Sequence, residues 1–345
     1  MTRLTRPSLI LLSVVVAAAL LAGGEPRVAA QAGAATVLKL ATMAPDGSVW
    51  HQALKQFGSD ARKVTGGRVA VNVFAGTQGD EPTIVRKMRL NQLQAGSLSI
   101  LGLVTIEDGF NALGIPLFFE SYDELVYVMD RMTPTFRSRL DAKGFVFLGW
   151  GHGGSTLVFS RTPLKTLAQL KQARLYTTAG DDRVVQWYKS SGYRPQPLAP
   201  TDMLTGLQTG LIDAVPVPAL AALAFQWYKQ APYMLDVNLG PLVGATIVTR
   251  RAWDRLSEPD RQALIDLAQA MDKRLRVDVP RQDEQAVAEM AKRGLTVVRL
   301  SAAETAALEG EARRFSDGMR TWEGLSSFVD EAVRERDAFR QKKKK

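Results

Sequence analysis

The sequence contains no cysteine and only two histidines, His51 and His152. The absence of cysteine excludes disulfide bonds and a lipid anchor attached to a cysteine, so the folded protein must depend on its own hydrophobic core. Two isolated histidines and no thiol also disfavour a zinc-type metal site, because such sites draw mainly on these two residue types. We therefore expect no metal and no cofactor.

Motifs of the common enzyme classes are missing as well. The sequence has no P-loop. His152-Gly153-Gly154 is similar to the oxyanion loop of some esterases, but no G-x-S-x-G nucleophile motif accompanies it. An exported hydrolase is thus disfavoured, and we expect a protein that is not an enzyme.

A strong positive charge is also absent from the body of the chain. The net charge is +9, but four lysines occupy the last four positions, 342–345. No basic stripe with interleaved aromatic residues is present, so we expect no nucleic-acid partner. We predict that residues 336–345 form a disordered basic tail.

Only the amino terminus carries a long hydrophobic run. Arg3 and Arg6 precede the apolar run 9–21, and small residues follow at 28–30. This order predicts that residues 1–30 are a signal peptide cleaved near Ala30, and that the mature protein lies in the periplasm. The alternative, an uncleaved membrane anchor, is disfavoured because the run is short.

Alternating strand and helix patterns predict an α/β fold with a largely parallel sheet. The central stretch has a predicted strand at 173–177, a helix at 183–190 and a second strand at 211–217. Such a unit is parallel, and ligands bind beyond the carboxyl ends of its strands. Tyr176 and Thr177 are therefore expected at a ligand-binding rim.

Several other elements are predicted from periodicity. Apolar runs indicate a strand at 98–104 and two short strands at 144–150 and 155–160, with a tight bend between these two. A helical pattern extends from Ser257 to about residue 293. Pro280 lies inside it and is expected to kink or divide the helix.

Segments spread over most of the chain resemble one family. They include LKLATMAPDGSVW at 38–50, LGIPLFF at 113–119, LKTLAQLKQARLYT at 164–177, LQTGLIDAVPVP at 207–218 and WDRLSEPDRQAL at 253–264. The sequence is similar to the extracytoplasmic solute receptors of tripartite ATP-independent periplasmic (TRAP) transporters, of the DctP type. The resemblance implies a periplasmic-binding-protein-like fold with two α/β lobes, a central cleft, crossing strands and a long bridging helix.

The resemblance also implies a function. Receptors of this kind close on a small organic ligand and deliver it to the membrane subunits of a TRAP transporter, which an ion gradient drives. The alternative on the same fold is a periplasmic ligand-sensing or scaffold subunit. We predict lobe I at 36–155 plus 249–335 and lobe II at 156–248, in a monomer or weak dimer.

The chain departs from the family where a ligand carboxylate is usually bound. The family's arginine on the strand 173–177 aligns with Tyr176, a second arginine falls near Thr156, and an asparagine aligns with Val217. The alternative is that Arg174, two residues earlier, supplies the missing guanidinium.

Without an arginine clamp, apolar and aromatic contacts must hold the ligand, which suggests an apolar or amphipathic molecule rather than a simple dicarboxylate. Further candidate ligand-binding residues are Met43, Trp150, Phe225 and Trp227 in the lining and Glu81 and Thr105 at the rim.

Overall fold

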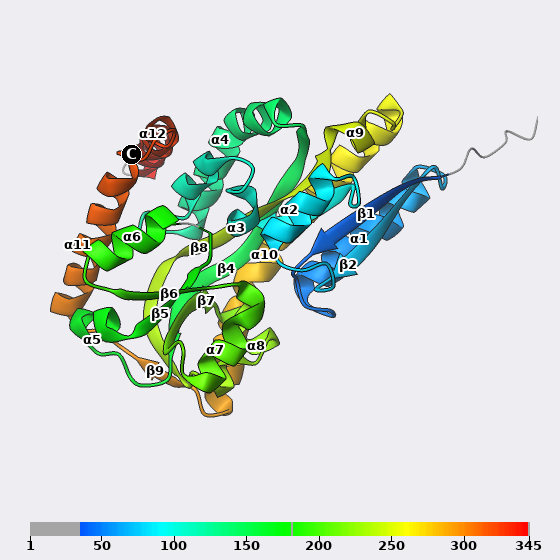
Figure 1. Ribbon diagram of the computed structural model, residues 1–345. Helices are drawn as coiled ribbons and strands as arrows, with labels where there is room; N and C mark the ends of the chain where they lie inside the picture. The colour runs from blue at the N-terminus through cyan, green and yellow to red at the C-terminus, as the bar shows by residue number, and fades with distance from the viewer. Residues whose placement is uncertain (1–34, 181, 344–345) are drawn as a thin grey trace, which may run out of the picture. The chain divides into compact units, whose positions relative to one another are not determined.

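The computed structural model describes residues 35–180 and 182–343 (Figure 1). The predicted signal peptide, residues 1–30, lies outside the described residues. Among the helices that are described, none combines the length and the hydropathy that a membrane crossing requires.

Nine strands of the described residues form one sheet, in the order β2-β1-β3-β8-β4-β7-β5-β6, with β9 paired to β8. Their bounds are β1 Thr36–Thr42, β2 Val69–Ala75, β3 Ala95–Ser99, β4 Phe145–Ser160, β5 Arg174–Thr178, β6 Arg194–Leu198, β7 Ala214–Pro218, β8 Tyr233–Thr249 and β9 Thr296–Val298. The parallel pairing of β5 with β7 confirms the central unit predicted from sequence.

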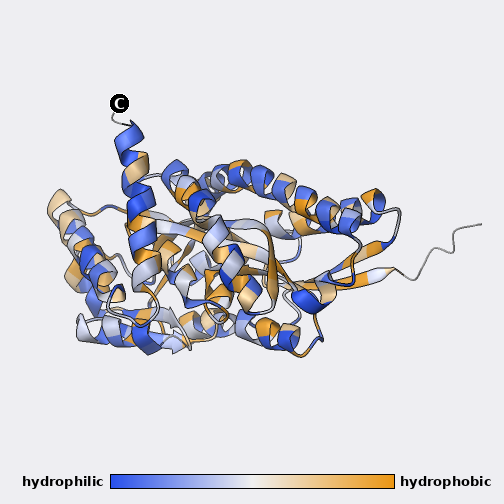
Figure 2. Ribbon diagram, turned by 90° about the horizontal axis from the view of Figure 1, so that it is seen from above, coloured by the Kyte–Doolittle hydropathy of each residue, from blue (hydrophilic) through white to orange (hydrophobic). Residues whose placement is uncertain are grey.

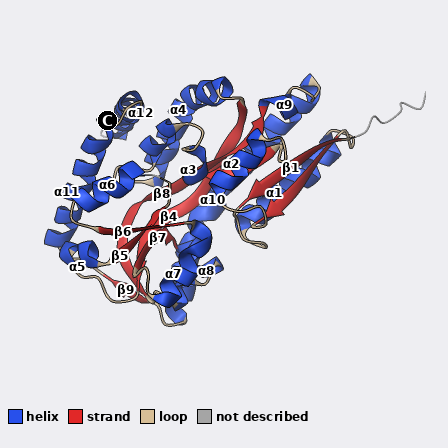
Figure 3. Ribbon diagram, in the orientation of Figure 1, coloured by secondary structure: helices blue, strands red, loops and turns tan. Residues whose placement is uncertain are grey.

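Helices lie on both sides of these strands (Figure 3). The α-helices are α1 Val49–Val64, α2 Glu81–Arg89, α3 Ile100–Leu103, α4 Tyr122–Ala142, α5 Leu167–Gln172, α6 Asp182–Ser190, α7 Met203–Thr209, α8 Ala219–Ala224, α9 Arg250–Trp253, α10 Glu258–Lys292, α11 Ala302–Met319 and α12 Ser326–Lys343. Short 3₁₀ turns occur at η1 Asp108–Leu113, η2 Pro200–Asp202 and η3 Trp227–Lys229. Hydrophobic and hydrophilic residues alternate along the longer helices, as expected for helices with one buried face (Figure 2).

Strands β4 and β8 are the longest and pair with each other in the middle of the sheet. On one side of them lie β1 to β3, which with their helices form lobe I; on the other lie β5 to β7, which form lobe II. Because β4 and β8 run through both groups, the predicted lobe boundary after residue 155 falls inside a strand. The residue limits of the lobes stay a prediction.

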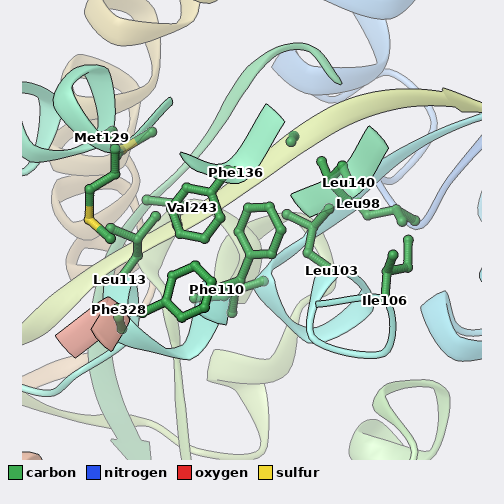
Figure 4. Close-up of a cluster of buried hydrophobic side chains, with 14 of the residues drawn as sticks. Leu98, Leu103, Ile106, Phe110, Leu113, Met129, Phe136, Leu140, Val243 and Phe328 are labelled. Carbon is green, nitrogen blue, oxygen red and sulfur yellow. The ribbon is translucent and has the colours of Figure 1, made fainter. Parts of the chain in front are cut away.

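The largest hydrophobic cluster fills lobe I (Figure 4). Phe110 and Phe136 stack with ring centroids 4.2 Å apart, and Phe328 of α12 stacks on Phe136 at 5.7 Å. An added Cβ at Gly109 would lie 2.4 Å from the Phe328 ring, so only glycine permits this approach. Helix α12 is therefore an integral part of the lobe I core.

This role of α12 corrects the predicted disordered tail, because residues 336–343 are helical. Arg336 lies over the Phe118 ring at 4.3 Å, and Arg340 binds the buried carboxylate of Glu124 and the carbonyl oxygen of Phe118. The basic residues thus make specific contacts with lobe I, which a count of charges does not reveal. Residues 344 and 345 lie outside the described part.

Two further predictions from local patterns were wrong, and a third was wrong in part. The apolar run at 98–104 contains the end of β3 and then α3, because the Ser99 hydroxyl caps the helix by accepting from the amide of Leu101. The two strands at 144–150 and 155–160 are one strand, β4, with register shifts in place of the expected bend. Helix α10 is a single helix of 35 residues, so Pro280 does not divide it, and the kink expected as the other outcome stays a prediction.

Candidate functional site

Glu81 is the most constrained of the predicted rim residues. It opens α2, and its carboxylate accepts hydrogen bonds from the amide and hydroxyl of Ser99, both at 2.7 Å, and from the amide of Gly102 at 2.8 Å. Burial raises the pKa of Glu81, and these three hydrogen bonds oppose the rise. An added Cβ at Gly102 would lie 2.8 Å from Glu81, so helix α3, directly after β3, packs tightly against this side chain.

Tyr176 is the middle residue of β5 and is only 5% exposed. Its hydroxyl oxygen is 3.4 Å from that of Thr178. Burial raises the pKa of Tyr176 to about 12, the contact with Thr178 opposes the rise, and the negative charge of Glu81 adds to it. The structure therefore brings Glu81 of lobe I within electrostatic reach of Tyr176 of lobe II.

Arg174 is engaged at the opposite end of the same strand. Its guanidinium donates to both carboxylate oxygens of Asp213, at 2.8 and 2.6 Å, and its amide donates to that carboxylate too. These hydrogen bonds outweigh partial burial and lower the pKa of Asp213. The pair ties the start of β5 to the loop before β7, and the alternative that Arg174 anchors a ligand stays a prediction.

Trp150 lies in the lobe I core and not in a cleft lining, which corrects the sequence interpretation. It is 2% exposed, its ring meets those of Phe110, Phe136 and Phe147, and its indole nitrogen donates to the Thr133 hydroxyl at 2.8 Å. The interpretation failed because it depended on a bend after Trp150, whereas β4 continues through this position.

Phe225, Trp227 and Val217 belong to the hydrophobic cluster between the lobe II sheet and α7, α8 and α10. Phe225 and Trp227 stack face to face at 4.6 Å, and Trp227 and Val217 are buried. Their packing explains these residues as core, and contact with a ligand stays a prediction for them.

The remaining candidates occupy different settings. Met43 is partly buried against the lobe I cluster just after β1, and Thr156 lies in β4 between Pro218 of β7 and Gly240 of β8. Thr105 is exposed and donates to the carbonyl of Gly102, while Thr177 is buried at the carboxyl end of β5.

The sequence analysis missed an ion pair between the lobes. Arg183, in the first turn of α6, donates to Asp108 of η1 at 2.9 Å, and its guanidinium lies over the Trp322 ring at 5.3 Å. Asp108 precedes Gly109 and Arg183 follows the turn at Gly180, but no sequence periodicity relates positions that are 75 residues apart. The pair brings η1 of lobe I to the helix that follows β5.

A second missed feature is a buried polar chain centred on His152. Its two ring nitrogens contact the Tyr122 hydroxyl and the Asp272 carboxylate, each at 2.6 Å. Asp272 also accepts from Arg276, which binds Asp130 of α4. This buried polar chain links β4, α4 and α10, so His152 has a structural role and the adjacent glycines do not form an oxyanion loop.

A cavity of about 700 Å³ lies between residues 115–120 and helices α11 and α12. None of the predicted ligand-binding residues lines it. Its arginines already pair with nearby carboxylates, as Arg320 does with Asp330 at 3.1 Å and Arg340 with Glu120 at 3.1 Å. Among the described residues, no group of three or more histidine, aspartate or glutamate side chains forms a metal-binding cluster.

Comparison with known proteins adds a family and a fold. The profile of "Bacterial extracellular solute-binding protein, family 7" (DctP) matches residues 40–319. A solute-binding protein of Verminephrobacter eiseniae is 24% identical over 272 residues, which cover 78% of this chain and 81% of that protein.

Two solved structures are similar along nearly the whole chain. One is DctP7 of Bordetella pertussis, an extracytoplasmic solute receptor, with a TM-score of 0.80 at 20% identity. The match covers 88% of this chain and 100% of the DctP7 chain. The other is a TRAP periplasmic solute-binding protein of Chromohalobacter salexigens, with a TM-score of 0.80 at 21% identity. That match covers 87% of this chain and 99% of the Chromohalobacter chain. These similarities confirm the predicted fold: two α/β lobes around a central cleft, with β4 and β8 crossing between them and α10 as the long helix.

Proposed function

Because this chain belongs to bacterial extracellular solute-binding protein family 7, whose members are receptors and not enzymes, we propose that it closes its lobes on a small organic solute in the periplasm. We further propose that it delivers this solute to the membrane subunits of a TRAP transporter. The family supports the first step directly. The second step is inferred from the similarity of the fold to TRAP receptors.

The polar groups at the cleft suggest the class of solute. By the resemblance to the family, Tyr176 stands where an arginine is usual, and we infer that β5 offers a hydroxyl in place of a guanidinium. The negative charge of Glu81, in lobe I, acts on Tyr176. The Glu81 carboxylate already accepts three hydrogen bonds from Ser99 and Gly102, and a carboxylate has about four acceptor sites, so we infer that it accepts one hydroxyl or amide donor of a ligand and repels a nearby carboxylate when it is ionised. This pairing is the single observation on which the proposed ligand class depends.

The proposed ligand is therefore a small amphipathic molecule that carries hydroxyl groups, and not a simple dicarboxylate. The similar structures hold small organic acids: the Bordetella receptor binds pyroglutamic acid and the Chromohalobacter receptor contains D-glucuronate. A single acid group is compatible with the proposal, provided that it lies away from Glu81.

A thermal-shift screen tests the proposal. The panel consists of succinate as a dicarboxylate, D-glucuronate and pyroglutamate as monoacids, and D-glucose as an uncharged polyol. A ligand at a hundredfold excess over Kd stabilises the folded state by roughly 2.7 kcal/mol, which such a screen detects. We expect stabilisation by a hydroxylated compound and none by succinate.

Two variants identify the site. Tyr176→Phe removes only the hydroxyl and is expected to weaken binding of the stabilising compound several-fold, as is Glu81→Gln. Tyr193→Phe is the matched control, because Tyr193 is also a buried tyrosine of lobe II but packs against Trp187 and Tyr188. Tight succinate binding that survives Tyr176→Ala would overturn the proposed ligand class.

A further inference from the structure

Three buried side-chain atoms in the described part of the chain have no hydrogen-bond partner: Asn111 Nδ2, Thr177 Oγ1 and Glu311 Oε2. The Glu311 carboxylate is neutralised although its Oε2 is unpaired, because its other oxygen pairs with Lys171 at 2.6 Å and with Arg314. The other two atoms belong to different lobes, Asn111 to η1 and Thr177 to β5.

Thr177 differs from every other buried threonine that the structure describes. The hydroxyl oxygens of Thr42 and Thr249 accept backbone amides, Thr65 bonds the carbonyl of Ala61, and Thr246 bonds the Ser97 hydroxyl. Thr177 is 6% exposed and has no such partner. An unpaired buried hydroxyl is unfavourable, so the fold keeps here a polar group that it does not itself use.

Each unpaired group lies close in sequence to a residue that contacts the other lobe. Thr177 is next to Tyr176 at the carboxyl end of β5, where ligands of open α/β sheets bind. Asn111 is three residues beyond Asp108, whose ion pair with Arg183 brings η1 against α6, the helix that follows β5. Leu175 is two residues before Thr177 and lies on the same face of β5. It lines a small apolar pocket together with Leu117, so the segment after η1 lies over this face of β5.

We propose that Thr177 Oγ1 and Asn111 Nδ2 bind the solute, one from each lobe. The amide nitrogen only donates hydrogen bonds, and the hydroxyl donates or accepts, so this end of the solute must present an oxygen acceptor: a carbonyl, hydroxyl or carboxylate oxygen. Glu81 binds donors, so the proposed solute has an acceptor-bearing part and a donor-bearing part. This inference rests on the proposed function and assigns the position of the solute's polar groups.

Thr177→Val is the decisive variant, because valine keeps the shape of threonine and removes its hydroxyl. If Thr177 serves the ligand alone, the variant without ligand is as stable as the wild type or more stable. Its affinity for the stabilising compound of the panel, measured by calorimetry, falls about three- to tenfold. Asn111→Leu is expected to weaken binding similarly.

Thr65→Val is the matched control, since Thr65 is fully buried but its hydroxyl donates to Ala61 and accepts from the amide of Val69. It is expected to unfold at a lower denaturant concentration and to bind with unchanged affinity. The two threonines should thus show opposite patterns.

A loss of stability in ligand-free Thr177→Val as large as that of Thr65→Val overturns the inference, because the hydroxyl would then have a structural partner. Unchanged affinity of Thr177→Val for a compound that binds the wild type overturns it too, while the proposed function stands. If the wild type binds no panel compound, the proposed ligand class fails, and the stability comparison, which needs no ligand, still decides the role of Thr177.

Discussion

Replacing Asp272 with asparagine should destabilise the fold strongly, because this carboxylate is the centre of the buried polar chain. It is 8% exposed and accepts from His152 at 2.6 Å and from Arg276 at 3.0 and 2.8 Å. Asparagine keeps the shape but turns one acceptor into a donor that faces other donors. Breaking a buried pair costs about 3–5 kcal/mol, and the retained oxygen reduces the expected loss to roughly 2–4 kcal/mol.

The assay is urea unfolding at pH 7, with Asp278→Asn as the control on the same helix. Asp278 also pairs with two arginines, Arg274 at 3.1 Å and Arg281 at 2.8 Å, but both arginines are more than half exposed. Surface pairs of this kind contribute about 0–1 kcal/mol. Equal losses in the two variants would refute the argument that burial gives the Asp272 chain its strength.

The pH dependence gives a second check. Burial raises the pKa of Asp272, but the hydrogen bonds and charges of His152 and Arg276 outweigh it, so the net shift is downward. A carboxylate with a lowered pKa in the folded state stabilises the protein above its unfolded pKa of about 3.9, and this stability is lost as the pH falls through the folded pKa. The difference between wild type and Asp272→Asn should therefore be full at pH 7 and shrink below about pH 4.

Three smaller predictions concern other positions. Gly154→Ala should lower the free energy of unfolding by roughly 2–3 kcal/mol, because Gly154 has φ +96° and a new Cβ would lie 2.9 Å from the Asp283 carboxyl group. Gly144→Ala is the control: Gly144 has φ +81° but open space around it, so the loss should be about 1 kcal/mol. Denaturant unfolding measures both. Trp150→Phe should cost about 1–3 kcal/mol through the lost bond to the Thr133 hydroxyl and the void left behind, and an unchanged midpoint would show that the bond is absent in solution. A double-mutant cycle of Arg183→Ala and Asp108→Ala should give a coupling energy of about 0.5–1 kcal/mol; zero coupling would mean that the lobes do not meet there in the free protein.

The sequence predicted the parts of the fold that depend on local periodicity. The strand–helix–strand unit from β5 to β7 followed from hydrophobic patterns, and the structure confirms it. The patterns did not predict β6, because proline is normally absent from strands and β6 contains Pro195 and Pro197; an edge strand tolerates it. The sequence analysis divided β4 because several glycines suggested a bend, whereas pairing with β8 and β7 keeps that segment extended.

The site was harder to predict than the fold, because its geometry depends on contacts between distant segments. The sequence analysis named both Tyr176 and Glu81 as candidate site residues, and in the structure the charge of Glu81 acts on Tyr176. Trp150 was placed in the cleft because aromatic residues suit both a core and a ligand pocket, and only the packing distinguishes the two. The unpaired amide of Asn111 leaves no mark in the sequence, since an unmet hydrogen bond is a property of the folded surroundings.

The edge strand β6 has a consequence for how the protein behaves at high concentration. An exposed sheet edge invites a strand of another molecule to add to it, which leads to aggregation. Proline has no amide hydrogen, and Pro195 and Pro197 alternate along β6, so one side of this strand lacks two of the donors that an incoming strand would use. The same two residues that concealed β6 from the sequence analysis thus protect that margin of the sheet from self-association.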